Sequence, residues 1–346
     1  MSAPAAEQGA ARRITVPPRS LRSRIPTREA SVLAALVLLV AVTTIVNPRF
    51  LDPQGVEDLL LNATIFVVLA VGQALVVITR NVDLSVGSIL GLAAFGTGSL
   101  FHSAPGTPIV VVFAVGILFG AVLGAVNGLI VTAAKVPALV ITLGTLYIYR
   151  GVSYAWAGGT QYFIGDAPDA FGNLAVQEVL GIPLIAVAAF VVAIVVGLVL
   201  YFTRAGRDLY AIGSDPDAAV LFGIPVGRRV VTAFIASGAL AGLAGVLYTA
   251  RFNSVGADTG TGLELQVVAA VVIGGVAIFG GSGSVVGAAI GAVLLTTMTG
   301  AIAALNVSKF WTQAIVGALI IGAILIDRLI SLRTAKRLLV EEDRIA

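Results

Sequence analysis

The segment Pro108-Ile-Val-Val-Val-Phe-Ala-Val-Gly-Ile-Leu-Phe-Gly-Ala-Val-Leu-Gly-Ala-Val-Asn-Gly-Leu-Ile-Val-Thr132 decides the class of fold. It carries no charged residue, and it is longer than the roughly 20 apolar residues that a helix needs to cross a bilayer. The whole chain is 58% hydrophobic and 11% charged, whereas soluble domains are about 25% charged. Because water cannot cover so apolar a surface, we expect an all-α membrane protein.

Further apolar segments lie on both sides of this one. Together they predict about ten transmembrane helices, at residues 30–47, 58–79, 84–101, 108–132, 137–157, 181–203, 229–250, 262–280, 284–304 and 310–328. The third and eighth are interrupted by glycine and polar residues, and the eighth is also compatible with a re-entrant segment.

The basic residues orient these segments, because short cytoplasmic loops collect Lys and Arg. With the N-terminus inside, only Arg49, Arg150, Arg251 and Lys309 fall on the outer side. We therefore predict cytoplasmic N- and C-termini. Residues 1–29 are expected to form a basic, disordered cytoplasmic tail, residues 30–328 the membrane domain, and residues 329–346 a cytoplasmic C-terminal tail.

Glycines recur every fourth residue on the quoted segment, at Gly116, Gly120, Gly124 and Gly128. Small residues at this spacing allow helices to approach closely in a membrane. We expect tight packing within one subunit, with a dimer seam or a substrate path as alternatives. The sequence at 120–126 also matches 287–293 at five of seven positions. Since these two segments run in opposite directions, an inverted repeat is predicted.

The interior loop at 204–229 contains the signature of a short helix. Ser214 or Asp215 can cap its start, Pro216 suits the first helical position, and Gly223 suits a left-handed end. A small amphipathic helix on such a loop is suited to docking into a groove of a partner protein. The alternative is a helix that lies on the lipid surface.

Asp217-Ala-Ala-Val-Leu-Phe-Gly223 resembles the Glu-Ala-Ala-x-x-x-Gly coupling loop of ATP-binding-cassette importer permeases, with Asp in place of Glu. The chain from about 60 to 328 is similar to the ribose-type sugar permeases, most closely those for rhamnose and autoinducer 2. The other residues that carry this resemblance are Thr79–Ser88, Val136–Thr145, Tyr149–Gly151, Gly260–Glu264, Gly274-Gly275 and Gly280–Ser284.

The resemblance implies a permease subunit that imports a monosaccharide or similar small polyol across a prokaryotic inner or plasma membrane. It implies a second permease copy or close paralogue, cytoplasmic ATPase subunits and an external sugar-binding protein, with no nucleic acid as partner. The chain lacks a Gly-x-x-x-x-Gly-Lys-Ser/Thr phosphate loop, so we expect no enzymatic activity and no bound cofactor, with ATP and Mg²⁺ used by the partner. The residues expected to couple to the ATPase are Asp215, Asp217, Ala218, Ala219, Phe222 and Gly223.

Polar residues at membrane depth are costly and need a reason. The candidates for a translocation path or gate are Asn81, Asp83, Asn127, Thr142, Thr145, Arg150 and Glu264. Local pairing and capping is the simpler role for Asp83, and capping or a subunit contact is the simpler role for Glu264. Asn127 is placed to bond across a helix pair, and Arg150 is expected to extend outward. A lone histidine and the absence of cysteine argue against a metal site.

Other functions stay open from the sequence. Permeases for branched-chain amino acids share part of the glycine pattern, and a secondary transporter is a second alternative. Secondary transporters usually place acids well inside the spans, whereas here the acids lie at span edges. An enzyme would need a cluster of catalytic side chains, and a structural or receptor-like membrane protein would not need the coupling loop.

Overall fold

A computed structural model describes residues 27–163, 165, 167–308, 310–311, 313–315, 317–318 and 321–322. Helices form most of this part of the chain. They are α1 (Thr27–Val46), η1 (Pro48–Leu51), α2 (Pro53–Ile78), α3 (Val86–Ser103), α4 (Ile109–Ala134), α5 (Ala138–Ala157), α6 (Asp169–Gly172), η3 (Asn173–Ala175), α7 (Leu184–Phe202), α8 (Arg204–Ser214), α9 (Pro216–Leu221), α10 (Val226–Phe252), α11 (Leu263–Ile273) and α12 (Val285–Ala304).

Six of the described helices are long and apolar enough to cross a membrane, namely α1, α2, α4, α7, α10 and α12. The predicted segments 84–101 and 137–157 are also helical, as α3 and α5. The eighth prediction, 262–280, was too long, because α11 ends at Ile273 before two glycines and Gly275 adopts a φ of +88°. Residues 1–26, the tail 329–346 and much of the tenth predicted segment lie outside the described residues, whereas residues 27–29 begin α1.

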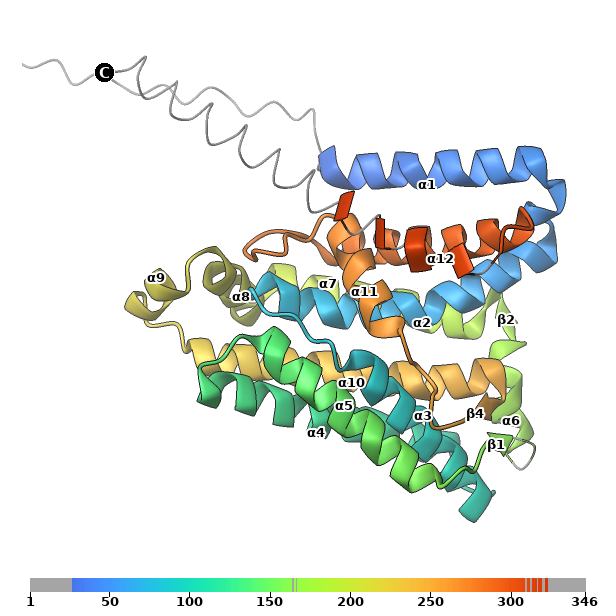
Figure 1. Cartoon of the computed structure of the whole chain (residues 1–346), viewed down its shortest axis with the longest axis horizontal. Coiled ribbons are helices and arrows are strands. Elements are labelled where there is room, and N and C mark those ends of the chain that lie inside the picture. Colours follow the sequence, from blue (N-terminus) through green and yellow to red (C-terminus); the bar gives the residue numbers. More distant parts are fainter. Residues whose placement is uncertain are drawn as a thin grey trace, which may run out of the picture.

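Helix α2 is the centre of the bundle. In its most apolar window 89% of the residues are buried, against 11% in α1. It contacts α7, α10, α11 and α12 (Figure 1). A helix that is hydrophobic all round lies among other helices or in lipid. Since α1 is as apolar as α2 but is mostly unburied, the packing of neighbouring helices, not apolarity, sets the central position of α2.

The contact between α4 and α10 is made through glycine. A Cβ added to Gly120 would meet the carbonyl oxygen of Gly238, and one added to Gly242 would meet that of Gly116. The two backbones therefore touch along the glycine face, as the spacing predicted. Gly245 of α10 does not take part in this contact, because it faces Leu90 and Ala93 of α3. The predicted tight packing within one subunit is confirmed for this pair.

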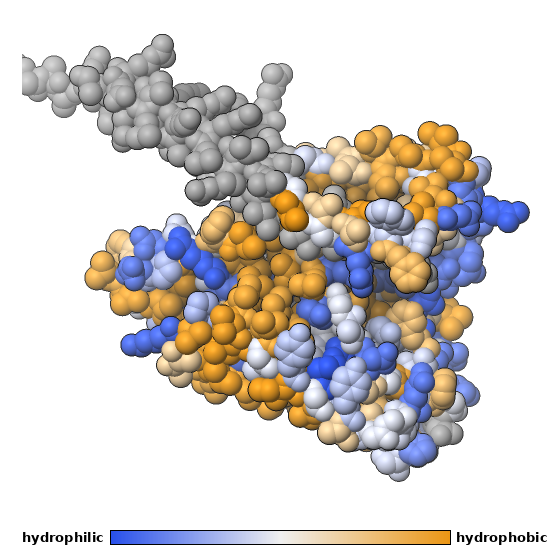
Figure 2. Space-filling model, in the orientation of Figure 1, coloured by the Kyte–Doolittle hydropathy of each residue, from blue (hydrophilic) through white to orange (hydrophobic). Residues whose placement is uncertain are grey.

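Short strands lie at one end of the bundle. Strand β1 (Tyr162–Phe163) pairs antiparallel with β4 (Ser254–Val255), with Tyr162 opposite Val255, and β2 (Glu178–Val179) forms a hairpin with β3 (Ile182–Pro183). Helices α8 and α9 lie at the opposite end (Figure 1). We call these the β4 end and the α9 end. Hydrophobic residues cover much of the face between them, and hydrophilic residues gather toward both ends (Figure 2).

Candidate functional site

The short helix predicted between Asp215 and Gly223 is present as α9. The Asp215 side chain accepts hydrogen bonds from the backbone N–H groups of Asp217 and Ala218, both at 3.0 Å. Asp215 rather than Ser214 is therefore the cap, and Pro216 occupies the first turn. Gly223 has a φ of +75°, the left-handed conformation that glycine adopts at low cost.

Helix α9 lies at one end of the molecule (Figure 1), and exposed apolar side chains form its tip. Leu221 and Phe222 are 87% and 84% exposed, whereas Ala219 is buried. A cluster of exposed apolar side chains beyond the membrane-spanning helices is typical of a contact surface for another protein.

The segment 204–214 is a helix, which the sequence analysis treated as loop. Thr203 caps α8 by accepting from the Gly206 N–H at 3.0 Å. Leu209 and Ile212 are buried, and Asp208 pairs with Arg229 of α10 at 2.7 Å. Amphipathic periodicity in 204–214 was the available signal. Helix α8 therefore packs on the bundle and fixes the position of α9, which follows it directly.

Three segments meet beneath α9, and we call this place the Arg80 junction: residues 78–85, 210–215 and 280–284. The Arg80 guanidinium donates from Nε to the Gly213 carbonyl oxygen at 2.5 Å and from Nη2 to that of Ser214. The Gly281 N–H donates to the Ile78 carbonyl oxygen at 2.9 Å. Arg80 itself has a φ of +64°, so the chain turns sharply where α2 ends.

Tyr210 ties α8 to the third segment of the junction. Its hydroxyl donates to the Gly283 carbonyl oxygen at 2.9 Å. Burial, assisted by the negative charge of Glu29, raises the pKa of the Tyr210 hydroxyl. The hydroxyl therefore keeps its proton and its role as a donor at neutral pH.

A buried polar network follows directly at the break between α2 and α3. Asp83 Oδ1 accepts from the backbone N–H and the hydroxyl of Ser85, at 2.9 and 2.7 Å. Asn127 of α4 donates to the Ser85 Oγ at 2.6 Å, and Tyr149 of α5 donates to the Asn127 Oδ1 at 3.1 Å. The predicted local pairing of Asp83 and the predicted helix-crossing bond of Asn127 are both confirmed. The network joins α3, α4 and α5 beside the Arg80 junction.

Other path candidates pack around the same break. The Thr142 hydroxyl donates to the Val82 carbonyl oxygen at 3.1 Å, and Thr145 is buried on the same helix, α5. Asn81 donates to Thr79 within the turn. The structure brings these residues together with Asp83 and Asn127, whereas their role in a path or gate stays a prediction.

Arg150 and Glu264 lie elsewhere, toward the loop that precedes α11. Arg150 Nη1 donates to the carbonyl oxygens of Thr259 and Ala257, at 2.6 and 3.1 Å. The guanidinium therefore extends toward the loop between β4 and α11, where carbonyl groups without a helical partner accept its hydrogen bonds. That this direction is outward stays a prediction. Glu264 accepts from the Gly262 N–H at 3.2 Å, which confirms its capping role.

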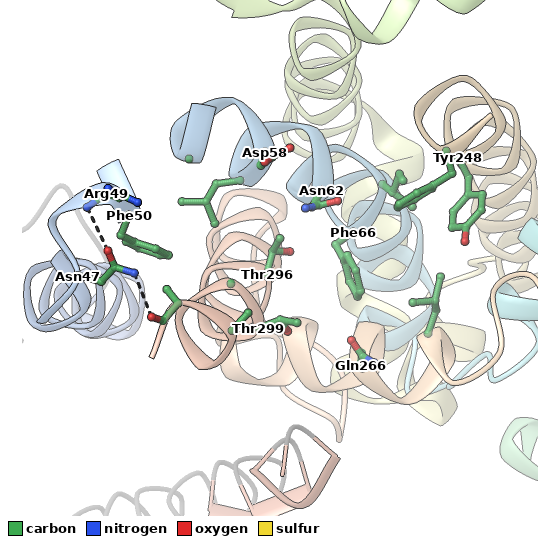
Figure 3. A pocket seen from close by; sticks show the side chains of 18 residues that line it. Asn47, Arg49, Phe50, Asp58, Asn62, Phe66, Tyr248, Gln266, Thr296 and Thr299 are labelled. Atoms are coloured by element: carbon green, nitrogen blue, oxygen red, sulfur yellow. Dashed lines mark hydrogen bonds between the residues drawn. The ribbon is translucent and has the colours of Figure 1, made fainter. Parts of the chain in front are cut away.

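Sequence reasoning missed a cavity of about 600 Å³ near the β4 end, between η1, α2, α10, α11 and α12. We call it the Asn62 cavity. None of the path candidates lines it. Figure 3 shows its polar and aromatic side chains, which include Asn62, Phe66, Tyr248, Gln266, Thr296 and Thr299. Isolated polar residues within apolar helices were the available signal, but they come from segments far apart in the chain.

Comparison with known proteins places the chain in a family. Residues 55–324 match the family described as branched-chain amino acid transport system / permease component. The chain is 34% identical over 307 residues to the autoinducer 2 import system permease protein LsrC of Enterobacter sp. (strain 638), covering 89% of this chain and 88% of the relative. The LsrC protein of Klebsiella pneumoniae is 35% identical over 307 residues, with the same coverage. No solved structure matches the chain.

The described helices include six that are long and apolar enough to cross a membrane, as in a multi-pass membrane protein. The family match covers most of the chain, so this protein belongs to that family of permease components. It is the permease subunit of an importer of the ATP-binding-cassette class, a transport component rather than an enzyme. Its location is the inner membrane. The resemblance read from the separate sequence blocks is thereby confirmed.

Proposed function

We propose that this permease moves a monosaccharide or a similar small polyol, and that α9 couples this movement to a separate ATPase. The observation that carries the proposal is the exposed apolar tip of α9, held rigidly by α8 and the Arg80 junction. The relatives named for autoinducer 2 import support a polyol-like substrate.

The charges of the Asn62 cavity favour a neutral solute over a branched-chain amino acid. A free amino acid carries an ammonium group, which a free carboxylate binds more strongly than a neutral acceptor does. Within the cavity lining, the carboxylate is Asp58, and it already pairs with Arg251 at 2.7 Å. Arg49 is exposed at the other side of the lining. The lining between them is formed by amides, hydroxyls and apolar side chains.

The coupling residues have distinct roles in this proposal. Asp215 caps α9, and the negative charge of Asp217 in the first turn stabilises the helix by interacting with the positive end of its dipole. Ala218 and Ala219 keep the buried side of α9 small, Phe222 docks in the ATPase, and Gly223 allows the chain to turn back. Motion of α9 then reaches Arg80, because its guanidinium binds the segment that leads directly into α9.

The polar network is the proposed gate. Asn81 and Asp83 directly follow Arg80, and Asn127, Thr142 and Thr145 hold this break against α4 and α5. A shift of Arg80 therefore changes the start of α3. Arg150 and Glu264 hold the loop near the opposite end and take part in the path only by positioning it.

The packing of two helix pairs supports an architecture of ten spans with an inverted repeat. Helix α4 packs on α10 and α12 packs on α2, so exchanging α2 with α10 and α4 with α12 maps one pair onto the other. Residues 30–328 would form the permease domain, with the segment 204–229 coupling it to the ATPase and with tails at 1–29 and 329–346. The exposed or partly exposed bases Arg80, Lys135, Arg204 and Arg228 lie toward the α9 end, which supports a cytoplasmic α9 end and cytoplasmic termini.

The proposed partners follow from this arrangement. A cytoplasmic ATPase that uses ATP and Mg²⁺ would receive α9, and a second permease copy or close paralogue would complete the path within the bilayer. An extracytoplasmic sugar-binding protein would deliver the solute at the β4 end. This chain needs no cofactor of its own and no nucleic acid for these roles.

The test is uptake of labelled ribose, xylose, rhamnose, galactose and autoinducer 2 in cells with and without this gene. Gly223→Arg should abolish the uptake that the gene restores, because a side chain at a φ of +75° strains the turn after α9. Gly106→Arg is the matched control, since Gly106 is exposed, has open space around it and lies outside the coupling segment. If the gene restores leucine uptake but no sugar uptake, the proposed substrate is wrong. Uptake that survives ATP depletion would favour a secondary transporter.

A further inference from the structure

We propose that the Asn62 cavity is the site in the permease that binds the neutral polyhydroxylated solute, through side chains of α2, α11 and α12. This inference rests on the proposed function and assigns the residues that contact the solute. The cavity volume of about 600 Å³ lies within the range of about 300–1,000 Å³ that small-molecule sites occupy.

Two carboxamides supply donors and acceptors. Asn62 of α2 and Gln266 of α11 line the cavity and are partly exposed to it. Within the described residues, neither side chain makes a hydrogen bond to the protein; Figure 3 shows both beside the space between α2, α11 and α12. Each carboxamide offers two N–H donors and an acceptor oxygen, a set that matches the hydroxyl groups of a sugar.

Two threonines complete the polar side on α12. The Thr296 hydroxyl donates to the Ala292 carbonyl oxygen at 2.9 Å, and the Thr299 hydroxyl donates to that of Leu295 at 3.1 Å. Because both protons are already used within the helix, the hydroxyl oxygens remain as acceptors. They lie one turn apart on the cavity side of α12. The hydroxyl protons of a polyol would satisfy them.

Aromatic rings form the apolar side. Phe66 and Tyr248 line the cavity, and the Tyr248 ring packs on Phe252 with centroids 4.4 Å apart. A flat, rigid ring is suited to the C–H face of a sugar, which is apolar. Tyr248 also lines a neighbouring hollow of about 290 Å³ that contains Gln161 and Asp258. Tyr248 thus lies between two adjoining chambers at the β4 end.

The absence of cysteine from the chain provides a direct test. Thr299→Cys introduces a single thiol in the cavity, and Ser103→Cys places one on the exposed end of α3, which also lies toward the β4 end. Sealed right-side-out vesicles with the complete importer are treated with a membrane-impermeant thiosulfonate reagent, with and without each sugar of the panel and with leucine.

We expect both thiols to react, and the transported sugar to slow the reaction of Thr299→Cys by about tenfold, as for a site that is about 90% occupied. The reaction of Ser103→Cys should not change. If Thr299→Cys does not react, or if a sugar that the importer carries leaves its reaction unchanged, the cavity is not the solute-binding site. If wild-type protein carries no sugar at all, the proposed function fails instead, and the two failures are distinct.

A second measurement concerns the contact residues. Asn62→Ala and Gln266→Ala should each lower the uptake rate at sub-saturating sugar concentration by up to about tenfold, as loss of a solute hydrogen bond predicts, with normal amounts of protein in the membrane. Asn173→Ala and Gln177→Ala are matched controls on exposed positions outside the cavity. Equal uptake by all four variants would overturn the assignment.

Discussion

The Arg80 junction and the Asn62 cavity use the same polar residue types in opposite ways. At the junction Arg80 donates to two carbonyl oxygens, and nearby Asn127 both donates and accepts. In the cavity the Asn62 and Gln266 side chains make no hydrogen bond to another described residue, and Arg49 lies exposed at the edge.

This difference indicates that the junction transmits movement between segments, whereas the cavity binds a solute. Side chains whose hydrogen bonds are all made within the protein fix segments to one another, so a displacement at one segment reaches the next. Side chains with free donors and acceptors facing a cavity can bind a solute without first breaking a protein contact. Matched substitutions in the two regions therefore test the functional assignment.

Glycine substitutions should show the largest difference in lost stability between the Arg80 junction and the Asn62 cavity. A Cβ at Gly213 would meet the carbonyl oxygen of Ile78 and the N–H of Gly281, which are backbone atoms. Gly213→Val should therefore lower the free energy of unfolding by about 3 kcal/mol, the upper end of the usual cost of overpacking. At Gly300 in the cavity the nearest atom is Leu59 Cδ2 at 3.2 Å, a side-chain end that can move.

Gly300→Val should consequently cost less than about 1 kcal/mol. The measurement is the temperature at which each variant aggregates in detergent, together with the amount of protein recovered from membranes. Equal losses for both variants would show that the junction is no more tightly packed than the cavity.

Asparagine substitutions should show the next largest difference in lost stability between the two regions. Asn127 is fully buried, and its removal takes one hydrogen bond from Ser85 and one from Tyr149, which keep their bonds to Asp83 and Leu123. Asn127→Ala is expected to cost about 2 kcal/mol, because each lost hydrogen bond contributes about 1 kcal/mol. Asn62→Ala should leave stability within about 0.5 kcal/mol of wild type.

Uptake should show a different pattern, because Asn62→Ala removes a solute contact without weakening the fold. Thermal midpoints and uptake rates of both variants, measured side by side, provide the check. A stable but inactive Asn127→Ala protein would show that the polar network acts in gating and adds little to the stability of the fold.

Arginine should give the smallest difference in stability. The Arg80 side chain is partly exposed, so the loss of its two bonds in Arg80→Ala should cost about 1.5 kcal/mol. Arg49→Ala should change stability by less than about 0.5 kcal/mol, as for most surface substitutions. Arg80→Ala is nevertheless expected to reduce uptake strongly, since the connection from α9 to the α2–α3 break is lost.

Arg80→Lys refines this prediction, because a lysine ammonium cannot reproduce the fork of a guanidinium. Its uptake should lie between that of Arg80→Ala and wild type. Normal uptake by Arg80→Ala would contradict transmission through the junction and direct attention to the contact between Tyr210 and Gly283.

Local patterns determined much of this protein. Apolar length predicts the membrane helices, and cap and turn residues predict α9 to within a residue, because capping depends on neighbours in the chain. The glycine spacing predicts the close contact of α4, since a four-residue period places these positions on one helix face. The local pairing of Asp83 and Glu264 follows from the same short-range chemistry.

Long-range packing decided the rest. The sequence does not show that Arg80 meets residues 213 and 214, that Arg150 turns toward Thr259, or that Asn62, Gln266 and Thr296 share one cavity. Each of these groups offers several possible partners along a helix, and only the arrangement of the helices selects one. A side chain's position along a helix is local information, whereas the identity of what it faces depends on how the helices pack against one another.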